Sequence, residues 1–159
     1  EESGTTFLEN ARIKARAAHE LACAAVLADD SGLIVDALDG APGVYSSRYS
    51  GVDGDDSANN AKLLRELSAV PLAKRTARFA SVLVFIDEDG LETVAEGFVE
   101  GRIGLVERGE HGFGYDPLFF PDAYNGEVTM AELTQSQKNA ISHRGNALRE
   151  LRKKLHPSD

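Results

Sequence analysis

Two adjacent carboxylates, Asp29 and Asp30, interrupt an apolar stretch and are suited to acid–base or metal chemistry. Apolar residues 26–28 precede them, and a Ser-Gly pair separates them from apolar residues 33–35. The pattern predicts a strand, a tight turn and a second strand, with both carboxylates at the strand end because burying an unpaired anion is costly. There they can coordinate Mg²⁺, which takes oxygen ligands and can lower the pKa of a bound water. The simpler interpretation of this stretch alone is a solvated Asp-Ser-Gly turn.

A second stretch, residues 112–117, combines aromatic side chains with glycines in the order Gly-Phe-Gly-Tyr-Asp-Pro. Glycine lets a backbone approach a ligand closely. Phe113 and Tyr115 flank Gly114, so both rings could cover a flat heterocycle. Stacking of a base on an aromatic ring contributes about 1–3 kcal/mol. The alternative is a loop whose aromatic side chains fill the core.

A third group places Lys138, His143 and Arg144 around the expected start of the last helix. A helix N-terminus favours acceptors and anions, and His143 and Arg144 can donate to a carbonyl oxygen on a base. His143 could instead be a locally bonded residue at the helix start. Lys14 lies four residues after Asn10 on the first expected helix, where a solvated lysine is the simpler interpretation. A carboxylate pair, a stacking platform and a cluster of donors together suit a nucleotide.

Helices and strands must position these residues, and several segments have the required patterns. Thr6 and Glu9 have the spacing of a capping box, which predicts a helix start. The other expected elements are a helix at 57–67 capped by Asp56 or Ser57, a hairpin of 79–86 with 91–98, a short helix at 134–140, and a helix at 142–155 with Leu148, Leu151 and Leu155 facing inward. Helices and strands are mixed, so the predicted fold class is α/β, with one domain built on a mixed sheet.

Composition narrows the possible functions. With 159 residues, 42% of them hydrophobic and 27% charged, the chain is long enough for one domain with a core. A formal net charge of −9 argues against a nucleic-acid polymer or an anionic membrane as partner, because both require clustered Lys and Arg. The one cysteine, Cys23, is expected to be a small core residue in a reducing compartment. With no apolar stretch of membrane-spanning length and no secretory signal, a cytoplasmic location is expected.

An ordered set of motifs along nearly the whole chain resembles the inosine triphosphate pyrophosphatase family. The motifs are Glu2–Phe7, Glu9–Ala11 with Lys14, Ala28–Leu33, Gly40–Tyr49, Gly112–Pro117, and Lys138–Asn139 with Ser142–Gly145. One such motif is weakly specific, whereas the ordered set is highly specific.

The resemblance implies hydrolysis of ITP, dITP or XTP to the monophosphate and pyrophosphate, with Mg²⁺. It implies that Glu2, Asp29 and Asp30 are metal-associated and that Asp30 accepts the proton of the attacking water. It implies further that Lys14 is directed at the phosphates and that the remaining matched residues contact the substrate. Those residues are Ser31, the base-binding loop Phe113, Gly114, Tyr115 and Asp116, and the purine-reading Lys138, His143 and Arg144. The implied fold is an elongated mixed α/β structure with two lobes and a central cleft, as a homodimer.

One departure concerns the start of the chain. Family members begin with a strand and a Ser/Thr-Asn-x-x-Lys loop that would precede Glu1, and residues 1–159 are expected to form a single pyrophosphatase domain that lacks both. Because losing a core strand would expose sheet edges, we expect that this strand and loop precede Glu1 in the whole protein. Two alternative functions stay open at this point: a metal-dependent phosphomonoesterase, and a nucleotide-binding module without catalytic activity.

Overall fold

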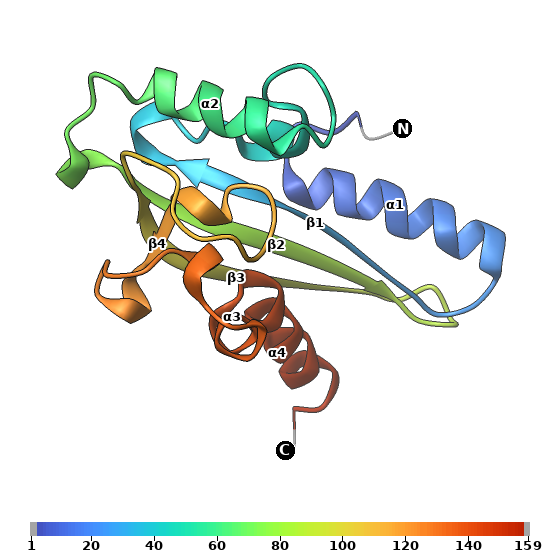
Figure 1. Cartoon of the computed structure of the whole chain (residues 1–159). Helices are drawn as coiled ribbons and strands as arrows, with labels where there is room; N and C mark the ends of the chain where they lie inside the picture. The colour runs from blue at the N-terminus through green and yellow to red at the C-terminus, as the bar shows by residue number, and fades with distance from the viewer. Residues whose placement is uncertain (1–2, 158–159) are drawn as a thin grey trace. The chain divides into compact units, whose positions relative to one another are not determined.

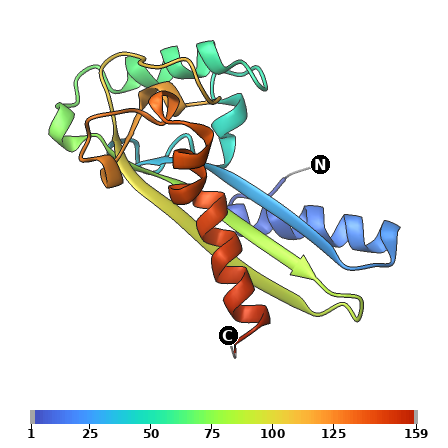
Figure 2. The same cartoon turned by 60° about the horizontal axis from the view of Figure 1, so that its bottom comes forward.

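The computed structural model describes residues 3–157, and Figures 1 and 2 show the course of the chain. The helices are α1 (Phe7–Ala22), α2 (Asp56–Glu66), α3 (Gln135–Ile141) and α4 (His143–Leu155), and the strands are β1 (Val26–Val35), β2 (Thr76–Ile86), β3 (Glu92–Ile103) and β4 (Phe119–Pro121). The strands form a sheet in the order β1-β2-β3-β4. None of the described helices is long and apolar enough to cross a membrane.

The sheet is antiparallel, and its centre is the predicted hairpin. The turn between β2 and β3 is closed by Asp87, whose Oδ1 accepts from the backbone N–H groups of Asp89 and Leu91, both at 2.9 Å. β4 pairs antiparallel with β3, with Arg102 opposite Phe120. The predicted α/β class is confirmed. The described strands contain no parallel pair of the kind that a mixed sheet would also hold.

The chain divides into two compact units. Unit 1 contains the residues up to Ser31, Ala80–Phe98 and the residues from His143 onward, and unit 2 contains Gly32–Phe79 and Val99–Ser142. The unit boundaries fall inside β1, β2 and β3. That residues 1–159 act as a single domain stays a prediction, as does the central cleft.

In unit 1, alternate residues of β2 pack against different helices. Val82, Val84 and Ile86 pack with α1, while Leu83 and Phe85 pack with α4. Because successive side chains of a strand point to opposite faces, α1 and α4 cover opposite faces of the strands in this unit. Figures 1 and 2 show the two helices on these two sides. Unit 1 therefore has two thin cores, one on each face.

Gly97 on β3 lets α4 lie close to the sheet. A Cβ added at Gly97 would lie 2.1 Å from the backbone N of Ala147 and 2.2 Å from the backbone O of His143. Asn146 of the same helix donates from Nδ2 to the backbone O of Phe98 at 2.7 Å. The first turn of α4 is thus held directly against β3.

Unit 2 has one larger core, formed by β1, β2, β3, α2 and the segment around β4. Leu63 and Leu67 pack inward from α2, and the rings of Phe79 and Phe119 lie 4.6 Å apart between centroids. Burial of these side chains removes apolar surface from water and supplies most of the driving force for folding. This core supports the 112–116 loop, because Tyr115 is one of its members.

The predicted strand–turn–strand around Asp29 and Asp30 is wrong, because β1 runs unbroken from Val26 to Val35. The turn propensity of Asp, Ser and Gly is outweighed by pairing with β2. The two carboxylates can lie within the strand because Lys14 and Arg144 pair with them.

Helix positions were predicted well, whereas several details differ. Thr6 caps α1 as predicted, but α2 is capped by Asp55, whose side chain accepts from the backbone N of Ala58. Of the leucines expected to face inward on α4, only Leu151 is buried; Leu148 and Leu155 are exposed. Cys23 is also exposed rather than in the core, because it ends α1 in a left-handed conformation.

Candidate functional site

The first group of predicted residues gathers in unit 1, where Lys14, Asp29, Asp30 and Arg144 form what we call the carboxylate cluster. Lys14 Nζ lies 2.8 Å from the backbone O of Asp29 and 3.3 Å from Asp30 Oδ1. Arg144 Nη2 lies 2.8 Å from Asp29 Oδ2, and its Nε donates to the same oxygen at 3.1 Å. The side chain of Asp30 is only 12% exposed. Two cations therefore balance two anions at one point of β1.

The carboxylates of Asp29 and Asp30 leave opposite faces of β1. Val26 and Ala28, which share the parity of Asp30, pack with α1, the helix that carries Lys14. Asp29 instead meets Arg144 of α4, on the other face. Asp29 and Asp30, which were expected to bind one metal together, thus point to opposite faces of the strand. Asp30 is the carboxylate on the same face as Lys14.

The donor set suits a hard cation that is held by few protein ligands. Carboxylate oxygens are the ligands that Mg²⁺ prefers, and Mg²⁺ is commonly held by one or two carboxylates plus substrate phosphates. Among residues 3–157, no three His, Cys, Asp or Glu side chains gather as a metal site. Glu2, the other expected metal-associated residue, lies outside the described residues. Asp30 fits such a site as a single ligand.

Ser31 and His143 lie at the edges of this cluster. Ser31 follows Asp30 in β1 and is half-buried. His143 is the first residue of α4, where its carbonyl lies against Gly97. Together with Arg144 it places the start of a thirteen-residue helix beside the strand that carries Asp29.

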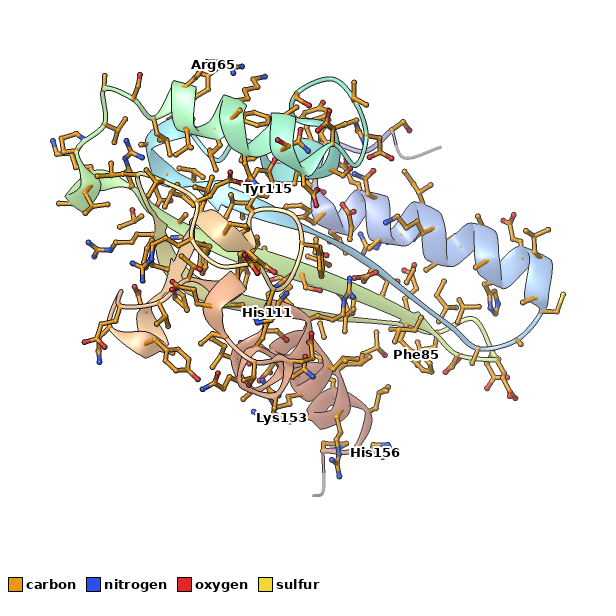
Figure 3. All side chains as sticks on the ribbon, in the orientation of Figure 1. Arg65, Phe85, His111, Tyr115, Lys153 and His156 are labelled. Atoms are coloured by element: carbon orange, nitrogen blue, oxygen red, sulfur yellow. The ribbon has the colours of Figure 1, made fainter. Side chains whose placement is uncertain are left out.

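The second group of predicted residues lies in unit 2, around the 112–116 loop. Phe113 is 72% exposed, while Tyr115 is 5% exposed. The Tyr115 hydroxyl donates to the backbone O of Ser46 at 2.6 Å, and burial raises the pKa of this hydroxyl. Figure 3 labels Tyr115 beside α2. Of the two rings expected to cover a heterocycle, only that of Phe113 is available, because the ring of Tyr115 fills the core.

Lys138 and Asp116 form a salt bridge beside Phe113. Lys138 Nζ binds Asp116 Oδ2 and lies 4.6 Å from the centroid of the Phe113 ring. Asp116 Oδ2 also accepts from the backbone N of Phe113 at 3.1 Å. Gly112 is required here, because a Cβ would lie 2.3 Å from the same oxygen. Asp116 therefore organises the loop and orients Lys138.

A pocket of about 340 Å³ opens next to Lys138 within unit 2. Its lining comes from the loop, from the segment before α3 and from α3 itself: His111, Gly112, Met130, Leu133, Thr134, Gln135 and Lys138. His111 is labelled in Figure 3. Lys138 lines this pocket, and its ammonium also lies against the exposed ring of Phe113.

Sequence reasoning missed the residues that hold the loop. Asp56 Oδ2 accepts from the backbone N of Gly114 at 2.9 Å, and Asn60 Nδ2 donates to the backbone O of Gly114 at 3.0 Å. The available signal was their spacing, since polar residues four apart on a predicted helix share a face. Lys138 was grouped with His143 and Arg144, but its described contacts are with Asp116 and Phe113. The shared hollow for Phe113 and His143 stays a prediction.

Comparisons with known proteins agree with one another. A model of the Ham1 family matches residues 1–154. The chain is 53% identical over 157 residues to the dITP/XTP pyrophosphatase of Oceanobacillus iheyensis, covering 98% of this chain and 78% of that protein. It is 56% identical over 153 residues to the dITP/XTP pyrophosphatase of Nocardia farcinica, covering 94% of this chain and 72% of that protein. The solved structure of the Staphylococcus aureus Ham1 protein matches with a TM-score of 0.92 at 43% identity, covering 100% of this chain and 81% of that one.

Proposed function

This chain belongs to the Ham1 family, and from that premise we propose that it hydrolyses deaminated purine nucleoside triphosphates to the monophosphate and pyrophosphate. The substrates are ITP, dITP and XTP, and their removal cleanses the nucleotide pool. The observation that carries the proposal is the Lys14–Asp30 pair, in a chain 53% identical to a protein named dITP/XTP pyrophosphatase.

The chemistry is the addition of water across the bond between the α and β phosphates. The water oxygen bonds to phosphorus, the bridging P–O bond breaks, and pyrophosphate leaves. In our proposal Asp30 accepts the proton of the water, because its carboxylate is largely buried and is held in place by Lys14. Positioned proton acceptors contribute roughly 10²–10⁴-fold to such reactions.

Lys14 supplies positive charge for the triphosphate. Its ammonium lies between the backbone O of Asp29 and the carboxylate of Asp30. In a chain of net charge −9, a polyanion needs cations concentrated at one place. Asp30, together with Glu2, would hold Mg²⁺, which when bound supplies Lewis-acid neutralisation of phosphate charge.

Recognition of the base rests on stacking and on hydrogen-bond donors. The exposed ring of Phe113 supplies a face for the purine. A 6-oxo purine presents an acceptor where adenine presents an amino donor, so the donors Lys138, His143 and Arg144 favour it. Asp116 orients Lys138. Ser31, which shares the Asp29 face of β1 because side chains alternate along the strand, is kept as a substrate contact.

A single assay tests this function. The protein is incubated with ITP and Mg²⁺, and ³¹P NMR identifies the products; IMP and pyrophosphate are expected, with ATP turned over far more slowly. Release of orthophosphate alone would refute cleavage between the α and β phosphates. Turnover of IMP would indicate a phosphomonoesterase, and ITP-dependent thermal stabilisation without product would indicate a binding module.

The proposal extends to assembly and location. We expect a homodimer in the cytoplasm and one pyrophosphatase domain formed by residues 1–159. Light scattering after size-exclusion chromatography measures the mass, and a monomer at assay concentration would contradict the dimer. Calorimetry tests the domain, because one domain unfolds in a single cooperative transition.

A further inference from the structure

Both peptide groups of Gly114 are held by the same helix. The N–H of Gly114 donates to Asp56 Oδ2 at 2.9 Å, and its carbonyl accepts from Asn60 Nδ2 at 3.0 Å. Asp56 begins α2 and Asn60 follows one turn later, so both face the loop. Gly114 has φ +61°, a left-handed conformation that most residues disfavour. The residue next to Phe113 is thus fixed in an unusual conformation from two sides.

Packing alone does not explain Asn60. The side chain is 3% exposed, and among residues 3–157 its Oδ1 has no hydrogen-bond partner. A buried unpaired acceptor costs free energy that an apolar residue would avoid. What the amide provides is two donations from Nδ2, to Gly114 O and to Glu107 Oε1, each at 3.0 Å. It therefore ties two points of one loop, the connection between β3 and Asp116, to α2.

The exposed ring of Phe113 depends on these backbone anchors. With 72% of the residue exposed, the described contact of the ring itself is with Lys138 Nζ, 4.6 Å from the ring centroid, and the backbone anchors do the rest. Its own N–H is bound by Asp116 Oδ2 at 3.1 Å, and the next residue is bound by Asp56 and Asn60. A ring positioned before the ligand arrives loses less conformational entropy on binding.

We infer that Asn60 and Asp56 are positioning residues of the base-binding loop, and that they raise nucleotide affinity by holding Gly114 and thus Phe113 in place. This inference rests on the proposed function, in which Phe113 stacks on the purine. The two residues act through Gly114 and do not themselves contact the nucleotide.

The experiment uses a single tryptophan as a reporter. The chain has no Trp, so Phe113→Trp places one fluorophore at the exposed loop position. In this background we compare Asp56→Ala and Asn60→Ala with two controls. Asp56→Asn keeps an acceptor for Gly114 N, and Asp55→Ala removes the cap of the same helix without touching Gly114. Time-resolved anisotropy without nucleotide, thermal melting, and KM and kcat for ITP are measured.

The expected result separates loop positioning from helix stability. Asp56→Ala and Asn60→Ala lower the tryptophan anisotropy and raise KM for ITP roughly fivefold, the worth of one hydrogen bond. Their kcat stays within about twofold of the parent, as expected for lost ground-state binding. Asp56→Asn restores KM, and Asp55→Ala lowers the melting temperature with KM unchanged.

Other outcomes overturn the inference. If KM is unchanged in Asp56→Ala, or rises equally in Asp55→Ala, then Asp56 and Asn60 only stabilise α2 and do not position the loop. Asp56 is exposed, so its variant stays informative if Asn60→Ala fails to fold. Failure of the proposed function is distinguishable, because the unsubstituted chain would then not hydrolyse ITP, while the anisotropy of the Phe113→Trp variants still reports the loop.

Discussion

The guanidinium of Arg144 lies 2.8 Å from the carboxylate of Asp29, although 115 residues separate them in the sequence. The next residue of β1, Asp30, meets Lys14 on the opposite face. Two helices far apart in the chain thus each neutralise one of two neighbouring carboxylates.

Replacing Asp30 with Asn tests the proposed proton acceptor. The substitution keeps the shape and removes the basic oxygen, so we expect kcat for ITP to fall by at least about 10²-fold. Asp29→Asn, on the other face of the strand, should reduce kcat much less. Steady-state kinetics with circular dichroism as a folding check measures both. A near-parental rate in Asp30→Asn removes Asp30 from the chemistry.

Replacing Arg144 with Ala separates recognition from stability. Both partners of the Arg144–Asp29 pair are more than one-third exposed, so the loss of stability should stay below about 1 kcal/mol. A lost charged donor to the base should raise KM for ITP by roughly tenfold. Arg152→Ala, an exposed change later on α4, is the matched control. Equal KM values in the two variants would exclude Arg144 from substrate recognition.

The two aromatic residues of the loop should behave differently. Phe113→Ala removes an exposed ring and should raise KM by roughly fivefold or more, with little change in melting temperature. Tyr115→Phe leaves the carbonyl of Ser46 without its hydroxyl donor and should cost about 1–3 kcal/mol of stability. Kinetics and thermal melting on both variants check this. A larger KM effect for Tyr115→Phe would reverse the assignment.

Removing divalent metal should abolish hydrolysis. After dialysis against EDTA we expect no pyrophosphate release from ITP, and recovery when excess Mg²⁺ is added. Asp30→Asn should not recover at the same Mg²⁺ concentration. Full activity in the dialysed enzyme would show that hydrolysis needs no divalent cation.

Acid should destabilise the segment before α3 through Glu132. Hydrogen bonding from the backbone N of Thr129, and then the charge and hydrogen bond of Arg108, lower the pKa of Glu132 below its usual 4.5. Its contribution is therefore present above the unfolded pKa and is lost as pH falls through the folded pKa. Glu132→Gln keeps an acceptor without this titration, so its melting temperature should fall less between pH 5 and about pH 3. If the melting temperatures of the parent and of Glu132→Gln fall equally with pH, Glu132 does not cause the acid destabilisation.

Local sequence signals predicted the helices and the hairpin. The continuity of β1 and the burial of Tyr115 depend on contacts between residues far apart in the sequence. The spacing of Thr6 and Glu9 located α1, and the turn at Asp87 located the hairpin, because caps and turns are written in adjacent residues. Strands were predicted on both sides of Asp29 and Asp30, but their continuity through the two carboxylates was missed, since the partners Lys14 and Arg144 come from distant segments. Burial of Tyr115 depends on Ser46, 69 residues away. The proposed site residues come from motifs and stay a prediction, whereas Asp56 and Asn60 belong to no motif and were recognised only from the fold.

Because side chains alternate between the two faces of β1, the position of each carboxylate along the strand determines which helix it meets. A one-residue slip of this strand against β2 would exchange the two destinations, sending Asp29 toward Lys14 and Asp30 toward Arg144. An insertion or deletion between α1 and Asp29 therefore preserves both ion pairs only if it changes the length of the loop before β1 and leaves the pairing of β1 with β2 in register. The register of the ten-residue strand β1 against β2 therefore decides on which face of the strand each carboxylate lies.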